Sequence, residues 1–254
     1  MYVHVILSKH REYYTAYKMN HGFATAGRHP AYNFQTSLSS RKEATFLSAA
    51  RCVFLCTQSG RSRGSNITQH TIMNIYQTEL QKLQYPIGKY ITPAEYTAES
   101  INQWMEVIRD TPQQLITLVA HLTDEQLSTP YRPGGWTLRQ LVHHIADSHI
   151  NACSRFRFAL TEDAPTIKPY AQEHWATLYD AEFGDIQLSL QLVTALHARW
   201  YLLLTHLTES QWHRAYIHPD FQEPIQLREA LAMYAWHSLH HLQQLRNLIE
   251  HKQW

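Results

Sequence analysis

Residues 226–250 have the sequence QLREALAMYAWHSLHHLQQLRNLIE. Its apolar side chains recur at helical spacing, at Leu227, Ala230, Leu231, Tyr234, Leu245 and Leu248. An α-helix places residues with this spacing on one face, and an apolar face of that kind packs against a core. The stretch therefore predicts a long helix with one buried side.

Two histidines, His237 and His241, continue that apolar stripe and lie four residues apart. Residues with this spacing on a helix have Cβ atoms roughly 5–6 Å apart. Two imidazoles can then bind one ion, because Zn–N bonds are only about 2.0–2.1 Å long. On a buried face an imidazole without a partner is energetically costly, so His237 and His241 are expected to have one. His240 lies roughly 100° around the helix from His241 and is therefore not on this stripe. The chain has 18 histidines, so a pair with this spacing is a weak signal by itself.

Three further segments show the same period and are predicted as helices, residues 97–122, 138–160 and 186–207. Thr137 is a good N-cap for the second of them, and Gln140 three residues later completes a capping box. Asp185 can cap the third helix. Pro112 lacks a backbone N–H, so it should kink or divide the first helix.

A short motif repeats between these helices. HLTDEQL (121–127) and HLTESQW (206–212) each follow a helix, and each precedes turn residues and a Leu-Arg pair that opens the next helix. The repeat predicts an all-α four-helix bundle of two helical hairpins, joined by the long crossover 161–185 with a short helix near 173–179. Helices within a hairpin should be neighbours, and the second and fourth helices should face each other.

The second helix contains VHHIADSH, residues 142–149. His144 follows Leu141 by three residues and therefore lies beside the core-facing stripe. If the second and fourth helices face each other, His144 can supply a third nitrogen beside His237 and His241. Three protein nitrogens and one water are the arrangement of a catalytic zinc site rather than of a closed structural one.

Other polar and aromatic residues carry weaker patterns. Four histidines are interpreted as surface or packing residues, His149, His197, His206 and His213, while His143 and His240 either support the ligands or are solvated. Asp147 can orient a ligand or be solvated, and candidates for a general base are Asp147, Glu162, Glu173 and Tyr234. Four aromatic residues of the connections either line a substrate pocket or cover the end of the bundle, Trp136, Tyr170, Trp175 and Trp212. Cys153 is interpreted as a packing residue.

The composition argues against several classes of protein. No apolar run approaches the ~18 residues that a membrane-spanning helix needs. A formal net charge of +1 gives no general reason to expect a nucleic acid or an anionic membrane as partner. Three cysteines without CxxC spacing indicate a reducing compartment, so we expect a cytoplasmic protein.

The N-terminal part differs in charge from the rest. Residues 1–72 contain nine Lys and Arg and two acidic residues, against 13 and 19 in the remainder. We interpret residues 1–84 as a basic extension, disordered or non-native, and residues 85–254 as the folded domain. In a second interpretation the extension is a nucleic-acid-binding arm, although it lacks clustered basic residues interleaved with aromatics. In a third, Met73 is the natural start.

Five segments together resemble the YfiT family of the DinB-like superfamily: YPIG (85–88), PGGWT (133–137), HHIADSH (143–149), ALHARW (195–200) and YAWHSLHH (234–241). The resemblance covers residues 85–250. It implies a DinB-like four-helix bundle in which His144, His237 and His241 hold one divalent metal ion per subunit. It also implies a homodimer and a metal-dependent hydrolase that acts on a small molecule. Some relatives instead transfer low-molecular-weight thiols such as bacillithiol.

Two reactions fit such a site. In a hydrolase, the ion lowers the pKa of its bound water toward ~7 and polarises a carbonyl or related electrophile. In a thiol S-transferase, the open position binds a thiol and holds it as thiolate. A non-catalytic metal-binding protein, with its site closed to substrate, is a third reading. Zinc is the expected metal because it is abundant and lacks redox chemistry, although nickel, copper and iron also suit three imidazoles.

Overall fold

The computed structural model describes residues 69–221 and 223–254. The interpretations of residues 1–68 therefore lie outside the described residues. Helix α3 (Gln69–Gln84), which the sequence analysis did not predict, precedes the bundle in the chain. The candidate site lies in a compact unit that includes Leu80–Trp254.

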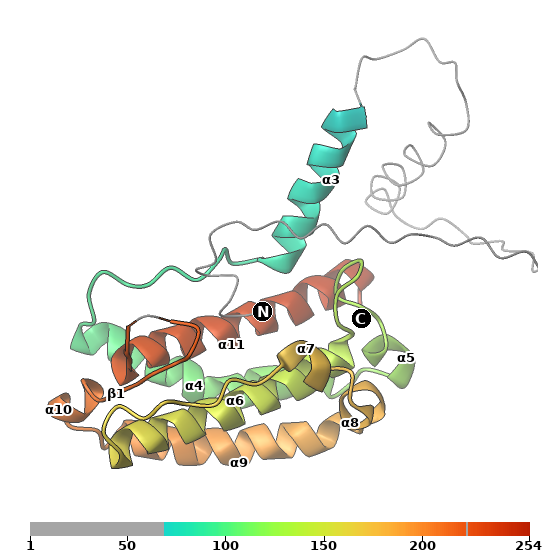
Figure 1. Ribbon diagram of the computed structural model, residues 1–254. Coiled ribbons are helices and arrows are strands. Elements are labelled where there is room, and N and C mark those ends of the chain that lie inside the picture. The colour runs from blue at the N-terminus through green and yellow to red at the C-terminus, as the bar shows by residue number, and fades with distance from the viewer. Residues whose placement is uncertain (1–68, 222) are drawn as a thin grey trace, which may run out of the picture. The chain divides into compact units, whose positions relative to one another are not determined.

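Four long helices form a bundle in this unit (Figure 1). They are α4 (Ala98–Val119), α6 (Leu138–Thr161), α9 (Ile186–Leu204) and α11 (Leu227–Lys252). The four predicted segments are thus confirmed to within a few residues at each end. Among the described residues, no helix combines the length and the low polarity that a bilayer-spanning segment requires.

The starts of these helices follow from their capping residues. The Thr137 hydroxyl accepts a hydrogen bond from the Gln140 backbone N–H at 3.2 Å, and the Gln140 side chain accepts one from the Thr137 N–H at 2.9 Å. Asp185 accepts a hydrogen bond from the Gln187 N–H at 2.9 Å and begins α9. These contacts satisfy backbone donors that have no partner inside the helix. Both predicted caps are confirmed.

Pro112 lies inside α4 without dividing it. Because proline has no N–H, the carbonyl of Ile108, four residues earlier, has no α-helical donor. His197 of α9 donates to this carbonyl instead, with 2.6 Å between its Nδ1 and the oxygen. A side chain of a neighbouring helix therefore satisfies the carbonyl that the proline leaves open.

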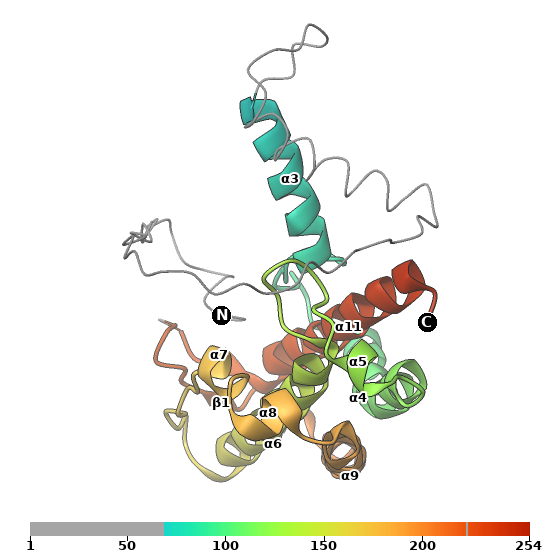
Figure 2. The same cartoon turned by 90° about the vertical axis from the view of Figure 1, so that its right-hand side faces the viewer.

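The packing order of the bundle differs from the predicted one. Helix α4 packs on α9 and α11, and α6 packs on the same two helices (Figures 1 and 2). The expected contact between α6 and α11 is confirmed. However, each short connection joins helices that lie across the bundle from each other, whereas the sequence analysis predicted neighbours. Connection length limits how far a chain can reach, but it does not decide which apolar faces pack together.

The repeated motif has a repeated structure. Four-residue helices α5 (Asp124–Leu127) and α10 (Glu209–Trp212) each begin with a capping box. After α10, strands β1 (Ala215–Tyr216) and β2 (Ile225–Gln226) pair antiparallel, with Ala215 opposite Gln226, and this small sheet was not predicted. The crossover contains α7 (Gln172–Trp175) and α8 (Tyr179–Phe183) where one short helix was expected.

The bundle interior holds two apolar clusters. Phe156, Trp200 and Tyr234 are fully buried in the first, which also contains Cys153, as expected of a packing residue. Leu141 and Leu245 belong to the second. Apolar side chains of all four long helices contribute to burial, which is the main favourable contribution to folding.

Candidate metal centre

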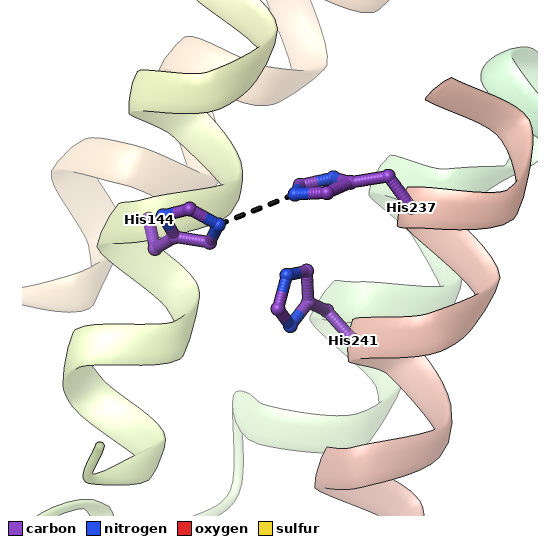
Figure 3. Close-up of side chains that lie close together, drawn as sticks. All are labelled: His144, His237 and His241. Carbon is purple, nitrogen blue, oxygen red and sulfur yellow. Dashed lines mark hydrogen bonds between the residues drawn. The ribbon is translucent and has the colours of Figure 1, made fainter. Parts of the chain in front are cut away.

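Three buried histidines from two facing helices converge in the bundle (Figure 3). His144 comes from α6, and His237 and His241 come from successive turns of α11. The Nε2 atoms of His144 and His237 are 3.2 Å apart. One ligand atom from each of the three residues lies within 4.8 Å of the others. The structure thus brings together the three residues that the sequence analysis selected, while their role as metal ligands stays a prediction.

The donor set fits a divalent ion. Two nitrogens on a tetrahedral ion with bonds of about 2.0–2.1 Å lie about 3.3 Å apart, close to the separation of His144 and His237. Burial lowers the pKa of all three imidazoles, that of His241 to about 4. They are therefore neutral at pH 7, and each has a lone pair for a metal ion.

The orientation of His241 is set by Gln244, one turn further along α11. The Gln244 amide donates to the backbone carbonyl of Gln84 at 2.8 Å, so this end of the side chain is the NH₂ group. Its oxygen then faces His241 Nδ1 at 2.8 Å and accepts a hydrogen bond from it. With its proton on Nδ1, His241 has the lone pair on Nε2. Contacts of this kind orient metal-binding histidines in proteins.

A cavity of about 130 Å³ opens beside the three histidines, which form part of its wall. Trp136 lines this cavity and packs against His144, with ring centroids 4.6 Å apart. Tyr131 and Arg132 also line the cavity. An ion held by three nitrogens would therefore have a position open to the cavity, which is the arrangement that distinguishes catalytic zinc sites from structural ones.

The PGGWT segment shapes one wall of the cavity. Gly134 has a φ of +66°, which residues with side chains rarely adopt. A Cβ on Gly135 would lie 2.7 Å from the Arg132 side chain and 2.8 Å from the Tyr131 ring. The two glycines thus let the loop fold tightly against Tyr131 and Arg132, and both of these residues line the cavity.

The structure shows which candidate for a general base lines the cavity. Glu173, on α7, lines the cavity. Asp147 and Glu162 are not part of its wall, and Tyr234 is buried in the core, where its hydroxyl accepts a hydrogen bond from Arg155 at 2.9 Å. Helix α7 is held to α6 by the Gln140 amide, which donates to the Ala176 carbonyl at 2.7 Å.

The aromatic residues of the connections have different roles. Trp136 lines the cavity, as described above, whereas Trp212 is buried in the apolar core. Tyr170 and Trp175 pack against each other, with ring centroids 4.7 Å apart, and neither belongs to the cavity wall. Only one of the four expected residues therefore contacts the candidate substrate space.

The remaining histidines divide into exposed and buried groups. His206 and His213 are exposed, as expected of surface residues. His143 is buried and hydrogen-bonded to Ser189 at 2.8 Å, and it is not one of the three converging histidines. His240 lines the cavity and stacks on Trp236, with ring centroids 4.7 Å apart.

Two histidines that the sequence analysis assigned to surface or packing positions are linked to the candidate metal centre, His149 directly and His197 through His149. His149 is buried, and its Nε2 lies 3.2 Å from Nδ1 of His237. His197 is also buried and lies 2.7 Å from His149. Spacing could not reveal these contacts, because each one joins two different helices. Gln244 was missed as well, although its position three residues after His241 was a usable signal.

Comparisons with known proteins identify relatives that span the bundle. A family model of the DinB superfamily matches residues 108–245. A protein of Bacillus pumilus (strain SAFR-032), named "Putative metal-dependent hydrolase", is 46% identical over 175 residues, which are 69% of this chain and 99% of the relative. In Bacillus subtilis (strain 168), the "Putative metal-dependent hydrolase YfiT" is 44% identical over 172 residues, 68% of this chain and 97% of that protein.

A solved structure is also similar. It is that of YfiT from Bacillus subtilis, described as "a probable metal-dependent hydrolase with an unusual four-helix bundle topology". It matches with a TM-score of 0.66 and 44% sequence identity, covering 68% of this chain and 99% of that one. The similarity extends over essentially the whole of that relative.

Proposed function

The chain belongs to the DinB superfamily, and on this premise we propose that it is a metal-dependent hydrolase of a small molecule. The observation that carries the proposal is the convergence of His144, His237 and His241 beside a cavity. Zinc is the proposed ion, with nickel as the alternative. The names of the relatives agree with a reaction of this class.

The protein side chains hold the ion and shape the space next to it. His144, His237 and His241 would supply its three nitrogens, and their neutral state needs no proton release at pH 7. When bound, such an ion lowers the pKa of a water molecule toward ~7 and polarises a carbonyl. Trp136 packs on His144 and thereby limits access of bulk solvent to one side of the site.

Glu173 is the proposed general base. It is the carboxylate in the cavity wall within the described part of the chain. Its position on α7, which is anchored to α6 through Gln140 and Ala176, keeps it in the wall of the cavity. A carboxylate there can accept a proton from the attacking water and return it to the leaving group.

Two cationic side chains define the substrate class that we propose. Lys89 and Arg132 line the same cavity as Glu173, so the charged residues of the wall carry a net positive charge. Arg132 is held by Tyr131, whose hydroxyl accepts a hydrogen bond from its Nε at 2.9 Å. A small electrophile with a carboxylate or a similar anionic group would satisfy these cations. We therefore propose an anionic carbonyl compound as substrate.

The homodimer and the reducing compartment belong to the same proposal. Leu188 and Leu192 lie one turn apart on α9 and are both exposed, as is Phe183 of α8. Exposed apolar side chains on one face can mark an interaction site, and a second copy of this chain is the proposed partner. Cys153 is a free thiol buried in the core, which suits a reducing compartment such as the cytoplasm.

The proposal is tested by elemental analysis together with an assay on small anionic amides and esters. We expect one divalent ion per chain and hydrolysis that chelation removes. His237→Ala should lose both the metal and the activity, because two imidazoles bind an ion much more weakly than three. The matched control is His251→Ala, which removes an exposed histidine from the last turn of the same helix.

The assay also separates the two candidate reactions. It is run with and without a small thiol that carries a carboxylate. Turnover without thiol supports hydrolysis, and turnover that requires the thiol would contradict it in favour of S-transfer. A fully active His237→Ala variant would contradict the metal site itself.

A further inference from the structure

Three buried histidines form a continuous hydrogen-bonded chain through the bundle. His197 Nδ1 lies 2.6 Å from the Ile108 carbonyl oxygen, and His197 Nε2 lies 2.7 Å from Nδ1 of His149. His149 Nε2 in turn lies 3.2 Å from Nδ1 of His237. The chain crosses all four long helices, from α4 through α9 and α6 to α11.

The contact between His197 and the Ile108 carbonyl determines which nitrogen donates in every other hydrogen bond of the chain. A carbonyl oxygen can only accept, so His197 must carry its proton on Nδ1, and its Nε2 is then an acceptor. His149 therefore donates from Nδ1 and accepts at Nε2. The donor to His149 is His237 Nδ1, which leaves the lone pair of His237 on Nε2.

This assignment requires that the rings be neutral, and their surroundings favour that state. His149 and His197 are almost completely buried, at 0% and 1% exposure, and burying a charged imidazole is unfavourable. A neutral imidazole has one donor and one acceptor nitrogen, so the proton position on each ring determines the proton position on the next.

We propose that His149 and His197 are positioning residues that fix the tautomer of His237, so that its Nε2 lone pair faces the metal centre. This inference rests on the metal site of the proposed function. It adds that one ligand is oriented by a chain of imidazoles ending at a main-chain carbonyl. His241 has a shorter arrangement of the same kind, in which Gln244 links it to the Gln84 carbonyl.

The origin of this chain lies in Pro112. In an uninterrupted α-helix, the Ile108 carbonyl would accept from the N–H of residue 112. Proline has no such donor, so the carbonyl is available to His197. Pro112 therefore contributes to the orientation of a metal ligand, although it does not contact the metal centre.

The test compares two substitutions of His149 by their affinity for zinc. His149→Gln retains an oxygen acceptor for His237 and an NH₂ donor for His197, whereas His149→Leu retains neither. Residues that orient metal ligands typically change affinity by roughly 10- to 100-fold when they are substituted. We expect a loss of this size in His149→Leu and a smaller loss in His149→Gln, measured by competition with a zinc chelator.

The control is His143→Leu, which removes another buried, hydrogen-bonded histidine of α6 that is outside the chain of contacts. It should bind zinc nearly as tightly as the unmodified protein. Equal affinity of His149→Leu and the unmodified protein would overturn the proposal. An equal loss in His149→Gln and His149→Leu would also overturn it, since the effect would then follow from packing alone.

A second measurement needs no variant that might misfold. Long-range ¹H–¹⁵N NMR spectra of the unmodified protein report which ring nitrogen of each histidine is protonated. We expect His197, His149 and His237 to be protonated on Nδ1, with and without zinc. A proton on Nε2 of His237 in the metal-free protein, or zinc bound through its Nδ1, would overturn the inference. Neither readout depends on hydrolysis, so an inactive protein with these tautomers would contradict only the proposed function.

Discussion

A single proton position separates a histidine that can bind an ion from one that cannot. His237 must have its lone pair on the nitrogen that faces His144, and the contacts of its other nitrogen decide this. His241 meets the same requirement through Gln244. At the scale of the residue, the candidate centre thus depends on partners outside the three converging histidines.

Glu173 provides a prediction at this scale. Glu173→Gln should lower kcat by roughly 10²–10⁴-fold, because the amide cannot accept a proton from water. The metal content should stay unchanged, since Glu173 is not among the converging ligands. Steady-state kinetics and elemental analysis on the same sample check both statements.

The matched control for Glu173 is Glu162→Gln. Glu162 is an exposed carboxylate at the end of α6, and it is not part of the cavity wall. The Glu162→Gln substitution should leave kcat within a factor of about two of the kcat of the unmodified protein, because surface substitutions usually have small effects. An unchanged kcat in Glu173→Gln would remove Glu173 from the proposed reaction.

At the scale of the element, α6 and α11 are held in the register that brings the histidines together. Helix α6 begins at a capping box, and its buried face carries His144 and His149 on successive turns. Helix α11 is buried along most of its length and carries the other two converging residues. Stable helices place these side chains more accurately than loops would.

The cap of α6 yields a prediction about stability. Thr137→Ala removes the hydroxyl that accepts from the Gln140 N–H, and loss of such a cap costs about 1 kcal/mol. The melting temperature of the metal-free protein should fall by roughly 2–4 °C, as measured by circular dichroism. Thr161→Ala, at the exposed other end of the helix, should change it by less. A Thr137→Ala variant with unchanged stability would show that the cap contributes nothing to folding.

At the scale of the whole molecule, the bundle interior contains an unusual number of neutral histidines. Burial lowers the pKa of six that form the centre or are linked to it, directly or through another histidine: His144, His149, His197, His237, His240 and His241. The lowered values reach about 4 for His197 and His241, from an ordinary value of 6.5. The folded, metal-free protein therefore excludes protons that the unfolded chain binds.

We predict that the metal-free protein loses stability as the pH falls from about 6.5 toward about 4. In that range the unfolded state binds more protons, so acid favours unfolding. Each histidine that stays neutral in the folded protein contributes up to about 1.4 kcal/mol per pH unit to this loss. A few such residues can remove a large part of the stability of a typical domain, roughly 5–15 kcal/mol.

Thermal unfolding at several pH values, with and without zinc, tests this dependence. Zinc should preserve the fold to lower pH, because an ion that binds only the folded state stabilises it. Asp147 acts in the opposite direction, since burial and Asp180 raise its pKa to about 6. One carboxyl group cannot offset six histidines. A melting temperature of the metal-free protein that is constant from pH 7 to pH 5 would contradict the prediction.

The proposed dimer is also a property of the whole molecule. Light scattering should give a mass near twice the chain mass of 29.8 kDa. The double substitution Leu188→Glu and Leu192→Glu should produce monomers, because it places charges on the exposed apolar face of α9. Ile91→Glu, at an exposed apolar residue elsewhere, should leave the mass unchanged. A monomeric unmodified protein would contradict the proposal.

The sequence analysis was correct about features that depend on near neighbours in the chain. The apolar period predicted the four long helices, and the caps at Thr137 and Asp185 were confirmed. Spacing of four residues placed His237 and His241 on one face. These features follow from the geometry of a single helix, which contacts within four residues define.

Contacts across the bundle were the part that the sequence could not supply. The sequence analysis wrongly predicted that α4 and α6 are neighbours, whereas they lie diagonally across the bundle. It also missed the roles of His149 and His197. Choosing among the four candidate bases also required the cavity, which α7 and the PGG loop build together. No periodic pattern or residue spacing in the sequence indicates any of these features.

The order of residues along the chain is thus enough to establish the helices, their first turns and the face on which the paired histidines of α11 lie. The packing of one helix on another, and the link from His237 to the Ile108 carbonyl, depend on contacts between residues 88, 48 and 89 positions apart. A hydrogen bond requires a distance of about 3 Å between its atoms. Local sequence sets such distances within one helix, but between helices they are set by the packing of the whole core.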